Sequence, residues 1–399
     1  MRSCMEFRMP QTILYGRGSF SKAGEQAGRF GKKALLISDR VMEELGNTEE
    51  CLHLMKQAGV DHAAYLHVNT EPTDVYVEEA LRLFVDEKCD VIVALGGGSC
   101  IDAAKAVALV AANGGYIGDY MGGKTPVERE PIPLIAVPTT AGTGSEATDV
   151  TVITNTADDV KMMIKHPALL PSVAIVDPLL TMSSPPSVTA ATGVDALCHA
   201  IEAYISRRAQ PLTDTLALSA IELISRNLRK AYANGNDLDA REQMALASMK
   251  AGAAFSNSSV CLVHGMSRPI GAVFHVPHGV SNAMLLPAVL AYTRDSAMER
   301  LAVIGRLMKP DGQGLSHEEW ADVAIAEAKR LCRDLHIPTV KTWGIDKAKW
   351  DEKVQKMAAD ALASGSPGNH PRVPSHDEIV RLYDICYHYD FHAIESVVE

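Results

Sequence analysis

The chain has 399 residues, of which 47% are hydrophobic and 22% charged, with 29 glycines and 20 prolines. This composition is typical of a globular protein and excludes disordered, collagen-like and low-complexity chains. Its 38 basic and 49 acidic residues leave a net charge of −11, which argues against nucleic acids and anionic membranes as partners.

The first half of the chain alternates short β-branched runs with helical periodicity. Residues 12–16 predict an edge strand that can pair with a second copy of the chain. Further strands are predicted over residues 34–38, 63–68, 91–95, 134–137 and 173–176. Between them, residues 75–87 and 101–112 repeat apolar positions at helical spacing. The alternation predicts an α/β domain with a parallel sheet covered by helices on both faces.

After Asp177-Pro178 the strand runs end and long amphipathic segments follow. Helices are predicted over residues 191–206, 212–233, 240–254 and 321–335. The Ser-Ser-Pro-Pro stretch at 183–186 interrupts both patterns and predicts a domain boundary. We therefore expect an α/β domain over residues 1–184 and an all-helical domain over residues 185–399.

Features of secreted or membrane proteins are missing from the sequence. Residues 1–8 carry no apolar signal-peptide core, and no later stretch reaches the roughly 20 apolar residues that a membrane span needs. The eight cysteines are scattered and form no Cys-x-x-Cys pair, a pattern that predicts reduced, mostly buried thiols. We therefore expect a cytoplasmic protein.

A glycine run follows the strand predicted over residues 91–95 and opens a helix. In Gly96-Gly97-Gly98-Ser99 the backbone can approach a pyrophosphate closely, and the N–H groups of the helix start attract its negative charge. Because the run is not Gly-x-Gly-x-x-Gly, a plain tight turn remains the alternative. Asp39 follows the second strand, where it can accept hydrogen bonds from an adenosine ribose or cap the next helix.

Hydroxyl groups and glycines in Pro138–Glu146 directly follow the strand at residues 134–137. Ligands of open α/β sheets bind at the carboxyl ends of the strands. Asp39, the glycine run and this hydroxyl-rich segment therefore predict a single nucleotide site.

Asp195 and His199 are four residues apart in a predicted helix, so both side chains lie on one face. A surface hydrogen bond is the ordinary explanation of such a pair. This helix, however, is apolar nearly all round, which predicts burial, and a buried carboxylate needs a partner. Carboxylate and imidazole ligands suit Fe(II), Zn(II), Co(II) or Ni(II). Spacing alone predicts Asp195, His199 and any two of His264, His275 and His278 as ligands.

Five motifs, in order between residues 7 and 285, resemble the iron-containing (group III) alcohol dehydrogenases. They are Phe7-x-Met9-Pro10 with Gly16-x-Gly18, Gly96-Gly97-Gly98-Ser99, Pro138 through Glu146, Gly193-x-Asp195-Ala196-x-x-His199, and His264-Gly265-Met266 through Pro277-His278-Gly279. The resemblance implies a Rossmann-like N-terminal domain and a helical C-terminal domain, an architecture related to dehydroquinate synthase. It also implies NAD and Fe(II), or Zn(II) or another divalent transition metal, in a cleft between the domains.

The resemblance assigns roles to individual positions. The family's metal ligands fall on Asp195, His199, His264 and His278, with His275 as a neighbour. The cofactor positions fall on Asp39, Gly96, Gly97, Gly98, Ser99, Thr139, Thr140, Thr143 and Lys161. The substrate pocket falls on Val150, Phe255, Arg268 and His275.

Arg268 departs from the family pattern, in which many members carry a second histidine four residues after the third ligand. An arginine does not titrate, so the proton must leave through the nicotinamide ribose hydroxyls, water or His275. Two roles remain open for Arg268. It can form a salt bridge with a nearby acidic residue, or it can bind a carboxylate or sulfonate of the substrate.

The resemblance implies reversible hydride transfer between a small primary alcohol and NAD, with the metal as Lewis acid. A reductase for a short anionic semialdehyde, which would use Arg268, is the first alternative. A phosphate-eliminating lyase related to dehydroquinate synthase is disfavoured because no Lys/Arg cluster lies beside the histidines. A nucleotide sensor without turnover is the remaining alternative. We expect a homodimer or a larger even-numbered assembly, because the predicted edge strand leaves backbone groups unpaired.

Overall fold

The computed structural model describes residues 4–158 and 160–393. The chain divides into two compact units. The first unit takes in the chain up to Ser184 together with residues 236–256, and the second takes in residues 185–235 and the chain from Asn257 onward. The helix α8 (Leu238–Ser258) therefore belongs almost entirely to the first unit, although it follows the first two long helices of the second.

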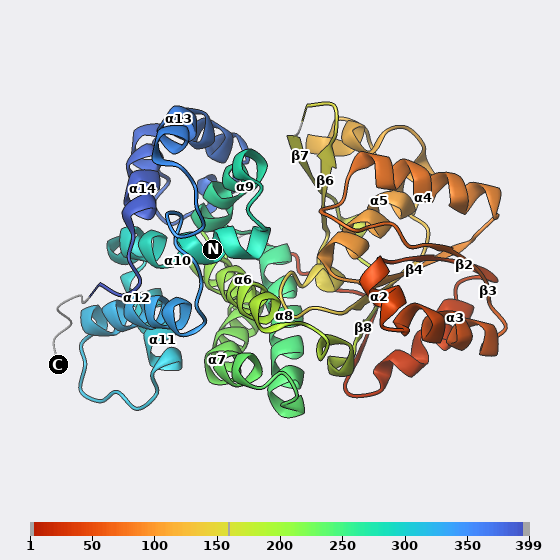
Figure 1. Cartoon of the computed structure of the whole chain (residues 1–399), viewed down its shortest axis with the longest axis horizontal. Coiled ribbons are helices and arrows are strands. Elements are labelled where there is room, and N and C mark those ends of the chain that lie inside the picture. Colours follow the sequence, from red (N-terminus) through yellow and green to blue (C-terminus); the bar gives the residue numbers. More distant parts are fainter. Residues whose placement is uncertain (1–3, 159, 394–399) are drawn as a thin grey trace. The chain divides into compact units, whose positions relative to one another are not determined.

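The first unit contains a six-stranded parallel sheet, in the order β1-β8-β5-β4-β2-β3. Figure 1 labels β8, β4, β2 and β3 of this sheet. Its strands are β1 (Thr12–Tyr15), β2 (Lys33–Ile37), β3 (Asp61–Tyr65), β4 (Val91–Gly96), β5 (Leu134–Pro138) and β8 (Val173–Val176). The α-helices between them are α1 (Ala23–Gly28), α2 (Arg40–Glu44), α3 (Asn47–Gln57), α4 (Asp74–Asp86) and α5 (Gly98–Asn113). The expected parallel α/β architecture is confirmed, and β1 lies at one edge of the sheet.

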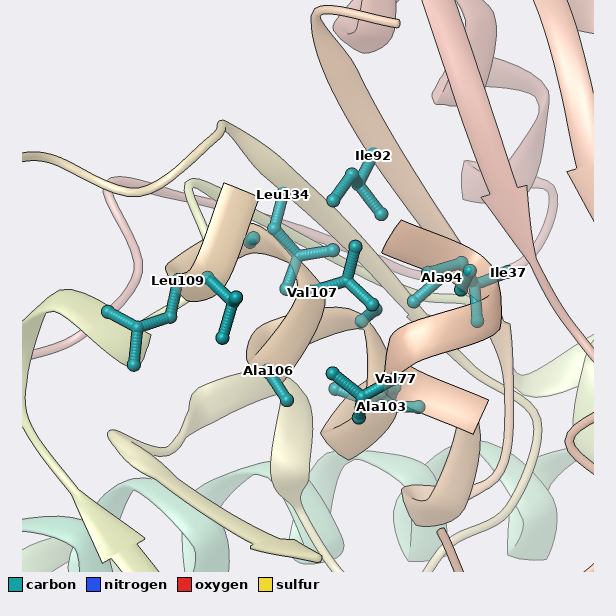
Figure 2. Close-up of a cluster of buried hydrophobic side chains, with 14 of the residues drawn as sticks. Ile37, Val77, Ile92, Ala94, Ala103, Ala106, Val107, Leu109 and Leu134 are labelled. Carbon is teal, nitrogen blue, oxygen red and sulfur yellow. The ribbon is translucent and has the colours of Figure 1, made fainter. Parts of the chain in front are cut away.

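Successive strand residues point to opposite faces of the sheet, and helices bury the residues of both faces. Leu35 and Ile92 face a cluster formed with α4 and α5, and Figure 2 shows Ile92 and Leu134 in this cluster with Val107. Leu36 and other residues of the opposite face pack against α1 and α3. Near-continuous apolar strands are what a sheet covered on both sides requires.

Two elements of the first unit differ from the prediction. β3 pairs in register with β2, from Lys33 opposite Asp61 to Ile37 opposite Tyr65, so it begins and ends earlier than predicted. The antiparallel hairpin β6 (Val150–Asn155) and β7 (Val160–Lys165) was not predicted. Buried and more exposed residues alternate along each strand, which is the pattern of a half-buried strand. The sequence-based prediction does not include strands in this segment. Short 3₁₀ helices lie at Ser19–Lys22, Ile117–Gly123, Ser145–Ala147, Pro167–Leu169 and Pro178–Thr181.

Helices form every regular element that the structure describes in the second unit, as expected. They are α6 (Pro186–Ile205), α7 (Pro211–Ala233), α9 (Leu262–Phe274), α10 (His278–Thr293), α11 (Met298–Met308), α12 (His317–Asp334), α13 (Lys347–Ala363) and α14 (His376–His388), with 3₁₀ helices at Arg294–Ser296 and Ser366–Asn369. Among the helices of the described residues, none is both long enough and apolar enough to cross a membrane. All eight cysteines are free, and seven are buried.

Candidate metal centre and nucleotide site

The four candidate ligands come from three helices of the second unit. Asp195 and His199 are one turn apart on α6, and every residue of this helix from Gly193 to Ile205 is buried. Because α6 is apolar on all sides, it is buried, and its few polar side chains are carried into the interior. His264 lies in the first turn of α9, and His278 is the first residue of α10.

The ligand side chains converge around the carboxylate of Asp195. Its Oδ1 lies 3.6 Å from Nε2 of His264 and 3.8 Å from Nε2 of His278. Its Oδ2 lies 3.9 Å from Nδ1 of His199. One ligand atom from each of the four residues lies within 4.8 Å of the other three. Of the three histidines that spacing left open, the structure brings His264 and His278 into the group and leaves His275 outside it.

Burial and the surrounding imidazoles act on Asp195 in opposite directions. Asp195 is 2% exposed, and burial alone would raise its pKa. The neighbouring imidazoles of His199, His278 and His264 outweigh burial and hold the pKa of Asp195 well below its ordinary value. Burial likewise opposes charging of His264, but two carboxylates contact it and raise its pKa. The centre is thus a buried anion surrounded by nitrogen bases.

Glu202, which the sequence patterns did not single out, orients His264. Its Oε2 lies 2.7 Å from Nδ1 of His264 and accepts the N–H of Cys261 at 2.9 Å, while its Oε1 accepts the N–H of Val263 at 2.6 Å. The carboxylate therefore caps the start of α9 and favours the His264 tautomer with the proton on Nδ1. Nε2 of His264 is then left with a lone pair that faces Asp195. The available signal was that Glu202 is the third residue of α6, after Asp195 and His199, with an acidic or imidazole side chain.

Asn282 is a second residue that the sequence patterns missed. It lies one turn after His278 on α10 and is fully buried. Its Nδ2 donates to Oδ1 of Asp195 at 2.6 Å and lies 3.1 Å from Nε2 of both His264 and His278. The amide nitrogen thus lies where the lone pairs of three candidate ligands point.

The donor set fits a divalent transition metal. A tetrahedral ion with bonds of about 2.1 Å holds its ligand atoms about 3.4 Å apart, which is close to the 3.6 and 3.8 Å between Asp195 and the imidazoles of His264 and His278. One carboxylate and three imidazoles favour Fe(II), Zn(II), Co(II) or Ni(II) over Ca(II) and Mg(II), which prefer oxygen ligands.

His275 and Arg268 lie on α9 or at its end, outside the ligand group. His275 ends α9 in the left-handed conformation, with φ 53°, and is exposed. Arg268 follows His264 by one turn, and its Nη1 donates to Oγ of Ser366 at 2.9 Å. Burial lowers the pKa of Arg268 to about 10, although Glu202 opposes this. In the described part of the chain no carboxylate lies within ion-pair distance of this guanidinium, and Glu202 acts on it only at longer range.

The residues expected to bind the nucleotide lie at the carboxyl ends of three neighbouring strands of the first unit. Gly96 ends β4 with φ 154°, and a Cβ there would lie 2.5 Å from Sγ of Cys100, so only glycine fits. A Cβ on Gly98 would lie 2.7 Å from the Thr143 side chain. The glycine run is thus packed against the segment after β5, and the N–H groups of the first turn of α5 open at this edge.

Asp39 lies between β2 and α2, next to the glycine run. Its Oδ1 accepts the N–H of Met42 at 2.9 Å, so it is a helix cap. Its Oδ2 lies 3.4 Å from Sγ of Cys100, the third residue of α5. The strand order reverses between β2 and β4, the place where open α/β sheets bind nucleotides.

The remaining expected residues are distributed over the first unit. Ser99 lies in the first turn of α5, and Thr139, Thr140 and Thr143 follow β5. Lys161 on β7 forms an ion pair with Glu71 at 2.6 Å. Val150 begins β6, and Phe255 lies near the end of α8; both are half-buried.

Lys105, also unanticipated, anchors the segment that follows these threonines. Its buried Nζ donates to Oγ of Ser145 at 3.0 Å, Oγ1 of Thr148 at 2.8 Å and the carbonyl of Val150 at 2.8 Å. Burial lowers the pKa of Lys105 to about 8. Oγ of Ser145 in turn donates to Asp102 at 2.6 Å. This network ties α5, which the glycine run opens, to the segment after β5.

Metal ligands on helices and a dinucleotide edge on a parallel sheet are the parts that a metal-dependent, nucleotide-linked oxidoreductase requires. Similarity to known proteins narrows this class. Residues 10–178 match the iron-containing alcohol dehydrogenases, and residues 189–387 match the C-terminal part of the Fe-containing alcohol dehydrogenase family. The chain belongs to the iron-containing alcohol dehydrogenase family.

Individual relatives match over almost the whole chain. The NAD-dependent methanol dehydrogenase of Bacillus methanolicus is 39% identical, with 94% of this chain and 98% of that protein covered. The crystal structure of a 1,3-propanediol oxidoreductase has a TM-score of 0.92 and 40% identity, covering 96% of this chain and 100% of that chain. Sulfoacetaldehyde reductase from Bifidobacterium kashiwanohense, solved with NAD⁺, has a TM-score of 0.86 and 27% identity, covering 98% and 100%. The chain is thus an NAD-linked oxidoreductase of alcohols and aldehydes that uses a divalent metal.

Proposed function

We propose that the protein catalyses reversible hydride transfer between a small primary alcohol and NAD, with Asp195, His199, His264 and His278 as the metal ligands. The observation that carries this proposal is the convergence of one buried carboxylate and three imidazoles within 4.8 Å. Fe(II) is the ion that the family name indicates. Zn(II) is expected to bind at least as tightly, so the ion present in the cell depends on availability.

The side chains around the centre prepare it for these reactants. When bound, the metal polarises the substrate oxygen, and NAD accepts or returns the hydride. Glu202 keeps the proton of His264 on Nδ1, so that Nε2 is a ligand. The proton can leave through the nicotinamide ribose hydroxyls, through water or through His275, which is exposed three residues before His278.

Cofactor binding is assigned to the carboxyl edge of the sheet. Asp39 accepts hydrogen bonds from the adenosine ribose through Oδ2, while Oδ1 remains the cap of α2. The first turn of α5 and the glycine run receive the pyrophosphate. The proposed cofactor contacts are Gly96, Gly97, Gly98, Ser99, Thr139, Thr140, Thr143 and Lys161. Val150 and Phe255 are proposed to contact the substrate.

The deciding experiment measures NADH formation at 340 nm with a panel of primary alcohols after reconstitution with Fe(II) or Zn(II). We expect turnover that a chelator abolishes and metal restores, and no turnover by His278→Ala. His388→Ala, which changes an exposed histidine of α14, is the matched control and is expected to be fully active. A nucleotide sensor would bind NADH without turnover, and a lyase would consume no net NAD. Full activity of a metal-free preparation would refute the proposal.

A finer proposal concerns the class of substrate. Arg268 favours substrates that carry a terminal carboxylate or sulfonate. Its helical position places Arg268 on the same side of α9 as His264. The Arg268 side chain is half-buried and its hydrogen bond goes to a neutral serine, whereas a cation withdrawn from water is normally paired with an anion in direct contact. A substrate anion can supply that partner. The similarity to a sulfoacetaldehyde reductase is consistent with this choice.

The test of Arg268 compares a neutral alcohol with its acid-bearing analogue in the wild type and in Arg268→Ala. A charged, bidentate contact contributes about 1.5–3 kcal/mol, so the variant is expected to lose roughly 10- to 150-fold in kcat/KM for the acid alone. Equal losses for both substrates would show that Arg268 is structural, and the anionic substrate class would be dropped.

Assembly and compartment complete the proposal. We place the enzyme in the cytoplasm, where free thiols persist. We propose a homodimer, or a larger even-numbered assembly, in which the exposed edge of β1 pairs with that of a second copy. Light scattering at micromolar concentration is expected to give at least twice 42.9 kDa. A 42.9 kDa species alone would exclude this assembly.

A further inference from the structure

Asn282 has three hydrogen-bonding distances to the ligand group and no other role in the proposed mechanism. Its Nδ2 lies 2.6 Å from Oδ1 of Asp195 and 3.1 Å from Nε2 of His264 and of His278. Asn282, Asp195 and His264 are buried, so water does not compete for their contacts, whereas the His278 side chain is 35% exposed. Because Glu202 contacts Nδ1 of His264, the Nε2 atom of that ring is an acceptor that the amide hydrogens can reach.

The amide NH₂ group and a metal ion require the same lone pairs. An amide nitrogen carries two hydrogens and is not a metal ligand, whereas Asp195, His264 and His278 would each direct a lone pair at the cation. A cation and this orientation of Asn282 therefore exclude each other. The side chain must change its orientation when the metal binds.

The other end of the amide indicates what that change is. Oδ1 of Asn282 is buried and has no hydrogen-bond partner among the described residues. A half-turn of the amide exchanges oxygen and nitrogen without a change of volume, because the two ends have the same shape. It would turn a carbonyl oxygen, an accepted metal ligand, toward Oδ1 of Asp195, and two acceptors this close require a cation between them.

We propose that Asn282 is a two-state residue of the metal centre. In the metal-free protein one hydrogen of its NH₂ group goes to Asp195 and the other to an imidazole, which stabilises a buried carboxylate and keeps the ligands assembled. In the loaded protein the amide has turned over and its oxygen faces the cation. This inference rests on the proposed metal centre, and it assigns the chain one oxygen donor beyond the four ligands.

Two variants test the two orientations separately. Asn282→Leu has a similar volume but no oxygen, so it is expected to weaken Co(II) and Zn(II) binding about 10- to 100-fold, the usual effect of removing a supporting group. Asn282→Asp keeps the oxygen but loses the donor and places a second carboxylate beside Asp195. It is expected to lower the Tm of the metal-free protein by about 5 °C or more while the metal-loaded protein remains folded.

Ser281→Ala is the matched control, because Ser281 is the buried neighbour of Asn282 and its Oγ donates to the backbone carbonyl of His278 at 2.9 Å rather than to a ligand atom. Metal affinity is measured by competition with a chelator, and Tm by circular dichroism with and without Zn(II). The control is expected to match the wild type in both.

The outcomes separate the inference from the function on which it rests. Wild-type affinity, or tighter binding, in Asn282→Leu would show that the amide only blocks the site and would overturn the oxygen role. If the leucine variant does not fold, Asn282→Ala, which removes the same oxygen without adding bulk, is read in the same way. An unchanged metal-free Tm in Asn282→Asp would overturn the donor role. A wild type that binds neither ion would instead refute the metal centre itself.

Discussion

Glutamine at position 202 keeps the size of the side chain but removes its charge and one acceptor oxygen. Oε1 of Glu202 accepts the N–H of Val263, while Oε2 accepts that of Cys261 and contacts Nδ1 of His264. In either orientation, the NH₂ of a glutamine would face at least one of these donors. A buried donor without an acceptor costs about 1–3 kcal/mol. We therefore expect Glu202→Gln to lower the free energy of unfolding by that amount.

The same substitution is expected to act on the metal through the tautomer of His264. Loss of the carboxylate charge weakens the preference for a proton on Nδ1 in either orientation of the glutamine, and an NH₂ group facing Nδ1 moves that proton to Nε2, which then cannot bind a metal. Supporting groups of this kind change metal affinity 10- to 100-fold, or by about 1.4–2.7 kcal/mol. Urea unfolding measures the stability, and chelator competition with Zn(II) measures the affinity.

Glu222→Gln is the control for Glu202→Gln, because Glu222 pairs with Arg226 on the surface of α7 at 2.7 Å. Exposed pairs contribute little, so this variant is expected to stay within about 0.5 kcal/mol of the wild type and to bind Zn(II) normally. Wild-type Zn(II) affinity in Glu202→Gln would refute the claim that Glu202 sets the His264 tautomer.

Three further results are expected. His264→Ala should abolish turnover and metal binding but retain NADH binding, which fluorescence titration measures. Loss of NADH binding as well would point to misfolding. Asp39→Gly should shift the kcat/KM preference from NAD toward NADP by roughly tenfold or more, since about 1.4 kcal/mol of charge repulsion corresponds to that factor, and a wild type that prefers NADP would contradict the assignment. Burial raises the pKa of Glu146 from 4.5 to about 7, although its own backbone N–H and Lys105 oppose this. Between these pH values the native state holds a proton that the unfolded chain releases, so the stability of the native state falls as pH rises. In urea titrations from pH 5 to 8, the free energy of unfolding of Glu146→Gln should therefore rise on the order of 3 kcal/mol relative to that of the wild type. A difference that stays constant over this pH range would disprove the protonated glutamate.

Local patterns predicted most of the fold, because strands and helices leave periodic signals within a few residues. The runs at 91–95 and 134–137 are strands because they are apolar on both faces and short, and the structure confirms both. The hairpin at 150–165 escaped because each of its strands is partly exposed and neither joins the parallel sheet. A short two-stranded element has a weak pattern.

Sequence alone determined that the side chains of Asp195 and His199 are neighbours, because residues four positions apart in one helix lie on the same face. It also determined the glycine run, since Gly96 adopts a backbone conformation that other residues rarely reach. Both features depend on covalent neighbours within one turn or one loop.

Only the tertiary structure decided the rest of the centre. Glu202 contacts His264 across 62 residues and Asn282 contacts Asp195 across 87, and no periodicity relates positions so far apart. Arg268 likewise donates its hydrogen bond to Ser366, which lies 98 residues later in the chain, and not to a nearby acidic residue. Such contacts arise from the packing of whole helices, whose buried faces the sequence identifies but whose pairing depends on how all of their side chains fit together.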